Sequence, residues 1–396
     1  MKTLLRIRFV ALALLLFVPS LSNAKEPGVT DDSILLGQSA AFGGPAAALG
    51  KSMRDGAMVY FDRINAQGGV HGRKIKLVSL DDGYEPERAI ANTRKLIDEE
   101  KVFALFGYVG TPTSYAVVPI LTEAKIPFFG PFTGAEGLRD PVNRYIFNIR
   151  ASYFDETERL VDWMVSDRKS NIAVFYQDDS YGKAGLEGVR RAMERRKLQI
   201  SATGTVQRNT VDVAGAVKSI GAVKPDAVIM ISAYKSCAAF IKELNKTRQR
   251  PIYMNVSFVG SKALAEELGA DGHGVIISQV VPSPLYPWGA ALEMRNLLTE
   301  RSPGVKPTFN DVEGFIAAKG IVDGLQRVGR DLTREKFVTA LETMRNVDLG
   351  AFPVTFTPKS HSGSQFVELT VIIGGGGSFP FLPLSRPGAT AQRGNR

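Results

Sequence analysis

Two hydroxyl residues lie where predicted strands give way to helices, and each could help to bind an anion. Thr111 follows Gly110, which lets a ligand approach the backbone, and precedes Pro112, which suits the first helical position because no amide hydrogen is needed there. Thr133 stands three residues before Glu136, the spacing of a capping box. Free backbone N–H groups at a helix start, together with a hydroxyl, suit a carboxylate. The two threonines are therefore candidate carboxylate ligands, and simple helix capping is the alternative explanation.

The motifs of several enzyme classes are incomplete. Residues 44–52 resemble a phosphate-binding loop, but five residues instead of four separate Gly44 from Gly50. Ser232 and Lys235 have the spacing of a β-lactamase motif, but the Ser-Asp-Asn and Lys-Thr-Gly sequences that accompany it do not occur. Three histidines and one cysteine leave little material for a nucleophile with its base or for a metal site. We therefore expect a protein that is not an enzyme and that needs no metal or cofactor.

The composition is that of a globular protein with more than one lobe. Of 396 residues, 44% are hydrophobic and 22% are charged. A single core stops growing at about 250–300 residues, so this length favours two lobes. The formal charge is +9, from 49 basic and 40 acidic residues, and the densest basic cluster, 190–197, contains Glu194 and no aromatic residue. That cluster is typical of a solvated helix face, and we expect no nucleic-acid partner.

The first 24 residues have the pattern of a secretory signal peptide. Lys2, Arg6 and Arg8 precede a continuous apolar run over 9–18. Small residues then lead up to Ala24, as at a cleavage site. The apolar run is about half the length of roughly 20 residues that a membrane-spanning helix needs. We therefore expect export and cleavage after Ala24.

The remaining chain alternates predicted strands and helices. Repeated strand–helix–strand units predict parallel sheets covered by helices on both faces, and two such series predict two doubly wound lobes. Ligands of such sheets lie beyond the carboxyl ends of the strands. The tail over 385–396 has no apolar periodicity and is expected to be disordered. The expected strands cover 34–39, 74–80, 102–106, 126–129, 172–176, 227–231, 252–255, 274–281, 354–356 and 366–373.

Short motifs in fixed order give the chain a resemblance to a known family. The stretches 42–45, 56–57 and 64–72 resemble the opening of a type I periplasmic solute-binding protein, and the branched-chain amino acid (leucine/isoleucine/valine) binding proteins of ABC importers are the most similar group. Tyr181-Gly182 and Gly260-Ser261 fit the same pattern. The resemblance covers roughly residues 29 to 384.

The resemblance implies an α/β architecture of two doubly wound parallel-sheet lobes joined by three crossings, the Venus-flytrap arrangement. Hinge closure then traps the ligand between the lobes. The crossings are expected near 150–152, 281–283 and 350–353. Lobe 1 is then expected to comprise 29–150 and 283–350, and lobe 2 to comprise 151–282 and 351–384.

The resemblance also implies roles for individual residues. Thr111 and Thr133, with Gly134, match the positions that hold the ligand carboxylate through hydroxyls and amides. Tyr181 matches a tyrosine that closes over the ligand from the opposite lobe, and Asp155 aligns with a cleft carboxylate.

One departure from the family pattern concerns the far end of the ligand. The family glutamate that pairs with the α-ammonium of the ligand falls at Ser257. Since a desolvated ammonium needs an anionic partner, either Asp155 substitutes or the ligand has no α-amino group. Lys235 could instead favour a second carboxylate or a keto group, or be a solvated lysine. Several aromatic residues favour an aromatic or amide-type ligand, unless they belong to the lobe cores: Phe42, Tyr84, Tyr108, Tyr234 and Phe258.

These observations predict the substrate-binding component of an ABC importer. It is expected to be a monomer in the periplasm that binds an amino acid or related small carboxylate and delivers it to the permease without chemistry. A ligand-sensing module with the same fold is the alternative from another class. A periplasmic hydrolase would need an activated nucleophile and base, for which no pair is evident.

Overall fold

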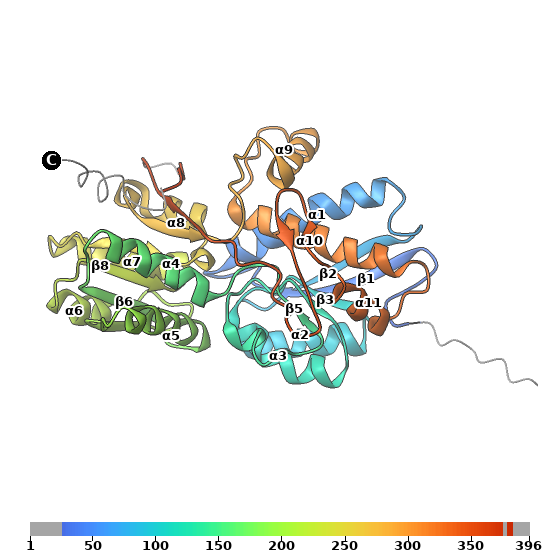
Figure 1. Cartoon of the computed structure of the whole chain (residues 1–396), viewed down its shortest axis with the longest axis horizontal. Helices are drawn as coiled ribbons and strands as arrows, with labels where there is room; N and C mark the ends of the chain where they lie inside the picture. Colours follow the sequence, from blue (N-terminus) through green and yellow to red (C-terminus); the bar gives the residue numbers. More distant parts are fainter. Residues whose placement is uncertain (1–25, 375–377, 383–396) are drawn as a thin grey trace, which may run out of the picture.

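The structure is a computed structural model that describes residues 26–374 and 378–382. The predicted signal peptide over 1–24 and the predicted tail over 385–396 lie outside the described residues. The described chain forms two lobes side by side along the long axis of the molecule (Figure 1). None of its described helices is long and apolar enough to cross a membrane.

The first lobe is built on a five-stranded parallel sheet with the strand order β2-β1-β3-β4-β5. Buried apolar runs such as Ala104–Phe106 form its central strands, as expected where helices cover a sheet on both faces. The strands are β1 (Ser33–Ala40), β2 (Lys74–Asp81), β3 (Ala104–Phe106), β4 (Phe128–Phe129) and β5 (Ile146–Phe147). The helices are α1 (Ala47–Ala66), α2 (Pro86–Asp98), α3 (Thr111–Glu123), η1 (Glu136–Leu138), α9 (Gly289–Arg301), α10 (Phe309–Val328) and α11 (Arg334–Leu341).

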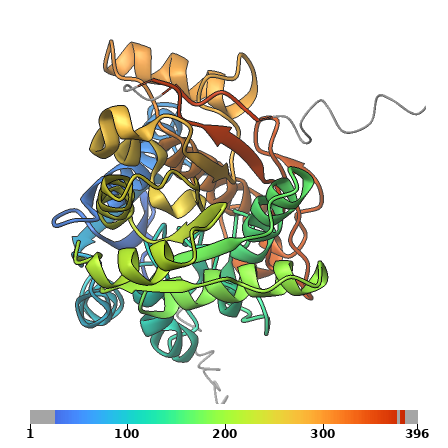
Figure 2. The same ribbon diagram turned by 90° about the vertical axis from the view of Figure 1, so that its left-hand side faces the viewer.

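The second lobe contains a six-stranded sheet with the order β13-β10-β9-β8-β6-β7, in which only β13 is antiparallel to its neighbour. Figure 2 views this lobe end-on, with its strands between helices. The strands are β6 (Ile172–Gln177), β7 (Thr203–Val206), β8 (Ala227–Ile231), β9 (Ile252–Asn255), β10 (Ile276–Gln279) and β13 (Glu368–Val371). The helices are α4 (Tyr153–Ser166), α5 (Ser180–Arg195), α6 (Ala214–Ala222), α7 (Tyr234–Lys246), η2 (Ser257–Val259), α8 (Ser261–Leu268) and η3 (Gly269–Gly272).

Helices α1 and α10 pack with their backbones in contact. A Cβ added at Gly56 would lie 2.0 Å from the carbonyl oxygen of Asp311, and one added at Gly314 would lie 2.2 Å from that of Met53. Only glycine allows so close an approach. Through this contact α10, which lies late in the sequence, packs into the core of the lobe that contains β1 and α1.

The chain passes between the lobes three times, and the third passage differs from the expected one. The first two lie near Arg150 and between β10 and α9, close to the expected positions. The hairpin of β11 (Val347–Asp348) and β12 (Pro353–Val354) is followed by Phe356, whose ring packs 5.3 Å from that of Phe147 on β5.

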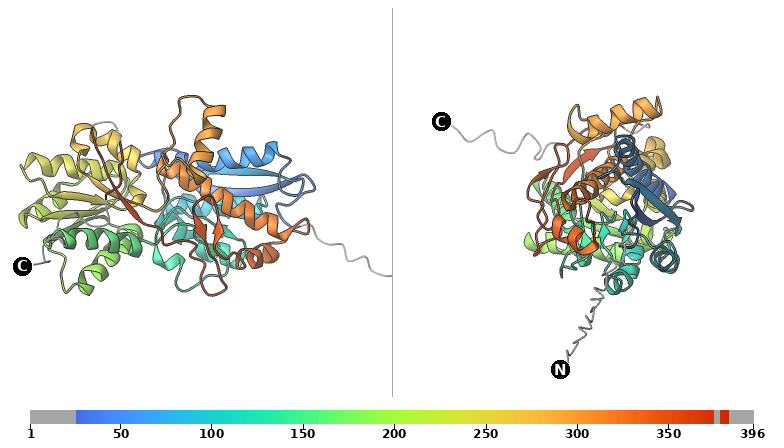
Figure 3. Two further views of the ribbon diagram at one scale, coloured as in Figure 1. Left: turned by 45° about the horizontal axis from the view of Figure 1, so that its top comes forward. Right: turned by 90° about the vertical axis from the view of Figure 1, so that its right-hand side faces the viewer.

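The segment after Phe356 also belongs to the first lobe. The amide of Gly363 donates to the carbonyl of Asn148 at 2.7 Å, and His361 stacks on Phe147. The crossing expected at 350–353 is therefore wrong, and the chain passes to β13 only after Gly363 (Figure 3). Residues 351–363 belong to lobe 1 because Phe356 packs against Phe129 of β4 and Phe147 of β5, and because Gly363 bonds to Asn148.

Candidate ligand-binding site between the lobes

The two predicted threonines meet at the face of the first lobe. Their side-chain oxygens lie 2.6 Å apart, and both residues are fully buried. Neither caps a helix, because Gly110 is the N-cap of α3 and Ala135 precedes η1. Thr133 Oγ1 also accepts from the amide of Ala135 at 3.2 Å. The helix-capping explanation of these residues is therefore wrong, and their hydroxyls form a polar pair at the ends of β3 and β4.

A buried guanidinium lies behind the turn that carries Thr133. Arg139 donates to the carbonyl oxygens of Ala135 at 2.8 Å and of Thr133 at 3.3 Å. The N–H of Gly134 belongs to the same planar peptide as the Thr133 carbonyl, so it points away from Arg139. Burial lowers the pKa of Arg139 to about 10, which leaves it positively charged at neutral pH. The turn therefore presents an amide hydrogen on one side and is backed by a cation on the other.

Gly134 also sets the distance between the lobes. A Cβ at this position would lie 2.5 Å from the ring of Tyr153, the first residue of α4, and the Gly134 carbonyl accepts from the Tyr153 amide at 2.6 Å. The Tyr153 hydroxyl accepts from Thr133 Oγ1 at 3.3 Å. Tyr153 thus joins the second lobe to the threonine pair.

Aromatic rings from both lobes close the interface. Phe258 of η2 lies 4.6 Å from Tyr181 of α5, and across the interface it lies 5.5 Å from Phe132 and 5.9 Å from Tyr84, measured between ring centroids. All four rings are buried. Gly110 is needed here because a Cβ would lie 2.2 Å from the Tyr84 ring. Rings at these separations attract one another beyond simple burial, so they hold the lobes together.

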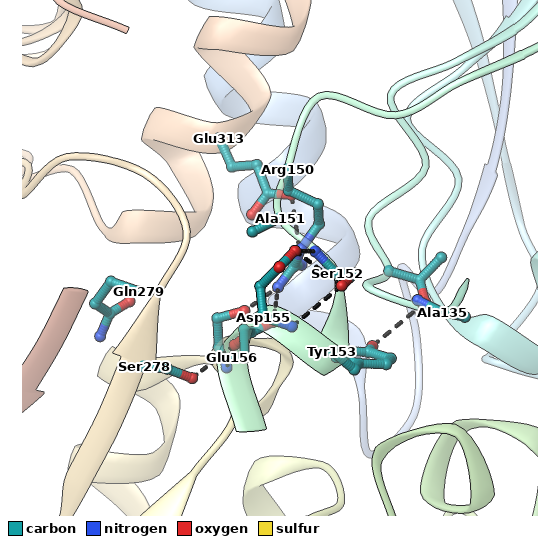
Figure 4. Close-up of polar contacts among 12 residues, drawn as sticks. Ala135, Arg150, Ala151, Ser152, Tyr153, Asp155, Glu156, Ser278, Gln279 and Glu313 are labelled. Carbon is teal, nitrogen blue, oxygen red and sulfur yellow. Dashed lines mark hydrogen bonds and ion pairs between the residues drawn. The ribbon is translucent and has the colours of Figure 1, made fainter. Parts of the chain in front are cut away.

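Arg150 occupies the first crossing with its side chain fully buried. Its Nη2 lies 3.1 Å from Glu156 Oε1 on α4, and its Nη1 lies 3.4 Å from Glu313 Oε1 on α10 (Figure 4). The guanidinium also contacts the hydroxyl of Ser257 and lies 4.9 Å from the ring centroid of Phe132. It therefore contacts residues of both lobes.

The charges of this cluster affect one another. Burial raises the pKa of Glu313 to about 7, against the opposing effect of Arg150. Burial alone would lower the pKa of Arg150, but the charges of Glu313 and Glu156 outweigh it and raise that pKa above its ordinary value. Glu156 Oε2 accepts from the amide of Ser257 at 2.7 Å and from the hydroxyl of Ser278 at 2.6 Å. Arg150 is thus a cation at any physiological pH, held beside the interface.

Several polar atoms at the interface have no hydrogen-bond partner among the described residues. They are Arg150 Nε, the hydroxyls of Tyr181 and Ser114, and both amide atoms of Asn255 at the end of β9. Buried polar groups in proteins are nearly always paired. A set of unpaired groups between two lobes is therefore typical of a surface that binds a polar molecule.

Four predicted site residues come together in this region, and a fifth joins them. Thr111, Thr133 and Gly134 form the face of the first lobe, and Tyr181 faces them beside Tyr153. Ser257 reaches the cluster through Arg150.

Asp155 does not face the interface as expected. Its carboxylate accepts from the amide of Ser152 at 2.9 Å and from its hydroxyl at 2.8 Å, which completes the capping box of α4. The expectation of a cleft carboxylate at Asp155 is therefore wrong. The next residue, Glu156, supplies the buried carboxylate because it lies on the inner face of the same helix turn.

Three further predicted residues lie elsewhere. Tyr108 is buried in the core of the first lobe, where its hydroxyl bonds to Thr93 at 3.0 Å. Lys235 is exposed to solvent, and Tyr234 bonds to the backbone of Ala48 at the rim. The sequence analysis missed Arg150, although a charged residue three positions after the apolar strand Ile146–Phe147 could have indicated it.

A second set of polar contacts joins the lobes at their rim. Arg208 of the second lobe bonds to Glu85 at 2.7 Å, and Asn209 donates to Glu85 at 2.7 Å and to the carbonyl of Gly83 at 3.1 Å. Gln177 donates to the hydroxyl of Tyr84 at 3.3 Å. We call these residues the rim clasp.

Two α/β lobes with buried, unpaired polar groups between them define a two-lobed ligand-binding protein. The sequence matches the family described as Periplasmic binding protein over residues 33–376. The chain belongs to this family and, within it, to the type I proteins of the Leu/Ile/Val-binding group, as the resemblance implied.

Individual relatives agree with this assignment. The crystal structure of a possible leucine/isoleucine/valine-binding protein from Rhodopirellula baltica is 34% identical, with a TM-score of 0.84 over 89% of this chain and 97% of that one. A substrate-binding periplasmic protein from Ralstonia solanacearum is 30% identical, with a TM-score of 0.83 over 88% of this chain and 100% of that one. Leu/Ile/Val-binding protein homolog 7 of Brucella abortus is 27% identical over 270 residues, 66% of this chain and 67% of that protein.

Proposed function

We propose that this protein is the periplasmic substrate-binding component of an ABC importer, and that it binds a small carboxylate between its lobes and delivers it to a permease. The observation that carries the proposal is the buried hydroxyl pair of Thr111 and Thr133 beside the amide of Gly134. Membership of the periplasmic binding protein family supports the transport role.

The chemistry of the threonine turn favours an anion. A carboxylate has only acceptor oxygens, so it needs hydroxyl or N–H donors on each of them. Thr111 and Thr133 bond to each other, and Thr133 donates to the Tyr153 hydroxyl, so the hydrogen of the Tyr153 hydroxyl is left for a further acceptor and the N–H of Gly134 supplies another. The charge of Arg139 behind the turn adds electrostatic attraction in a region from which water is excluded.

Binding and closure are coupled in this proposal. Tyr153 and Tyr181 approach the carboxylate site only when the second lobe lies against the first. A ligand that contacts both lobes binds the closed arrangement more tightly than the open one, and this difference in affinity favours closure. The closed molecule is then the form that the permease recognises, and no bond of the ligand is broken.

Thermal denaturation with matched ligands tests the carboxylate site. A panel of amino acids, 2-oxo acids and aromatic acids is compared with the carboxamide of each. We expect at least one acid to raise the melting temperature and its amide to have little effect, because a ligand at 100 times its Kd stabilises the folded state by about 2.7 kcal/mol. Equal effects of acid and amide, or no effect of any acid, would contradict the proposal.

Uptake measurements test the transport role. Deleting the gene should abolish uptake of the acid found by denaturation, and the full chain should restore it. Uptake that is unchanged, together with a lost transcriptional or behavioural response to the acid, would show a sensor instead.

A further inference from the structure

We infer that Arg150 binds the second polar group of the ligand, so that the ligand is a carboxylate bearing an oxygen acceptor, as a 2-oxo acid does, and no α-ammonium. This inference rests on the proposed function, since it concerns the other end of the same ligand. The inference is argued from the hydrogen bonds and ion pairs that the charged groups between the lobes already make.

The carboxylates near the interface are already engaged. Glu156 uses one oxygen for Arg150 and the other for Ser257 and Ser278. Asp155 caps α4, and Asp179 accepts from Gln177 at 2.6 Å and from the amide of Tyr181 at 2.9 Å. Glu136 Oε2 has no hydrogen-bond partner among the described residues, but the charge of Arg139 already acts on this carboxylate. An ammonium that entered the interface would therefore compete with Arg150 or Arg139, or with existing hydrogen bonds, for each of these carboxylates.

Glu313 does not alter this conclusion. Its carboxylate lies 3.4 Å from Arg150 Nη1, so an ammonium that approached it would approach the guanidinium as well. Arg139 is a second buried cation on the same side of the interface. A third positive charge between the lobes would be opposed by both, and burial would increase that repulsion because the local dielectric constant is low.

The unpaired groups are mainly donors. Arg150 Nε carries a hydrogen without an acceptor, Arg150 Nη1 has only the ion pair with Glu313 at 3.4 Å, and the Tyr181 hydroxyl has no partner among the described residues. A guanidinium cannot accept a hydrogen bond, so only an oxygen or another acceptor of the ligand can complete it. Leaving such groups unpaired on ligand binding costs free energy, so the site discriminates against ligands that have no acceptor at this point.

The position of Ser257 strengthens the argument. Its hydroxyl contacts Arg150, and its amide donates to Glu156, so this residue belongs to the same cluster. The small side chain of Ser257 leaves Arg150 with a neutral hydroxyl as its neighbour at this point instead of a third carboxylate.

Calorimetric titration with matched acid pairs tests the inference. Leucine is compared with 4-methyl-2-oxopentanoate, and phenylalanine with phenylpyruvate. We expect the 2-oxo acid of at least one pair to bind at least about tenfold more tightly than its amino acid, which corresponds to one hydrogen-bonding difference of about 1.4 kcal/mol. Amino acids that bind as tightly or more tightly would overturn this inference and leave the proposed function standing. If no acid of either series binds, the proposed function falls, and this inference falls with it.

A variant that adds a negative charge tests the role of the cluster without removing Arg150. Ser257→Glu places a carboxylate beside the guanidinium. We expect it to weaken binding of the 2-oxo acid at least about tenfold and to improve binding of the matched amino acid. Ser166→Glu is the control, because it makes the same charge change at the far end of α4, about 20 Å along the helix from Tyr153.

Circular dichroism and the melting temperature of each variant exclude misfolding as the cause. Equal affinities of Ser257→Glu and wild type for both acids would overturn the inference.

Discussion

The side-chain oxygens of Thr111 and Thr133 lie 2.6 Å apart although the residues are 22 positions apart in the sequence. They meet because β3 and β4 are parallel neighbours, so the loops after them leave the same edge of the sheet. The pair belongs to two adjacent strand ends and moves with the first lobe as one unit.

Removing both hydroxyls should weaken ligand binding without unfolding the chain. Thr111→Val with Thr133→Val keeps the side-chain volume and removes two donors. We expect a loss of affinity of about tenfold to a hundredfold, since a hydrogen bond to a charged group contributes about 1.5–3 kcal/mol. Titration calorimetry measures the affinity. Thr93→Val is the control, because its hydroxyl bonds to Tyr108 in the core and should alter stability only. Unchanged affinity in the double variant would place the carboxylate elsewhere.

Breaking the rim clasp should destabilise the closed arrangement. Arg208→Gln removes the ion pairs with Glu85 and Asp179. Because partly exposed ion pairs contribute about 0–1 kcal/mol, we expect affinity to fall by up to about fivefold, mainly through faster ligand release. The effect should shrink at high salt, and stopped-flow measurement checks both points. Arg190→Gln is the control, since its partners Glu187 and Glu194 lie on the same helix surface. An equal change in the two variants would contradict a specific role of the clasp.

The contact between α1 and α10 should make one glycine irreplaceable. Gly56→Ala would force a Cβ to within 2.0 Å of a backbone carbonyl, so we expect a loss of about 2–3 kcal/mol in the free energy of unfolding. Gly215→Ala is the matched control, because nothing lies within 4 Å of its added Cβ on α6. That change should stabilise by about 0.5 kcal/mol through helix propensity. Chemical denaturation of both variants provides the measurement, and equal stabilities would refute the close packing.

Glu313 should make stability depend on pH. Burial raises the pKa of this carboxyl from its ordinary 4.5 to about 7, while Arg150 and Arg139 oppose the shift and Glu156 adds to it. Between these pH values the folded chain holds a proton that the unfolded chain has released, so this contribution to stability is present below about pH 4.5 and is lost as pH rises to about 7.

The variant Glu313→Gln cannot lose that contribution. Relative to wild type, its free energy of unfolding should therefore rise between pH 5 and pH 8, by up to about 3 kcal/mol, because one pKa unit corresponds to about 1.4 kcal/mol. Urea denaturation of both proteins across this pH range measures the difference between their free energies of unfolding. Groups other than residue 313 titrate in both proteins, so their contributions cancel in this difference. A difference that is constant with pH would show that Glu313 is ionised throughout.

The sequence was sufficient for the fold and for half of the site. Buried runs such as Ala227–Ile231 and the motif order predicted two parallel sheets, since both signals are local. Thr111 and Thr133 were predicted because they lie in the short segments that lead from predicted strands into the helices that follow them.

The rest depended on contacts that no local pattern contains. Asp155 and Glu156 are neighbours, and only the direction of α4 shows that the first caps the helix while the second faces inward. Arg150 gains its role from Glu313, more than 160 positions away. The third crossing was misplaced because Phe356 packs against β5 instead of continuing into the second lobe.

The second sheet takes its outermost member from the very end of the fold. β10 pairs with β9 on one side and with β13 on the other, and β13 begins only at Glu368. Until that stretch has been synthesised, or if it is cut away, β10 presents a row of unsatisfied peptide groups on an apolar ribbon. Such an edge recruits strands from other chains. Short C-terminal deletions that reach β13 should therefore cause aggregation during biogenesis, long before they affect recognition of any solute.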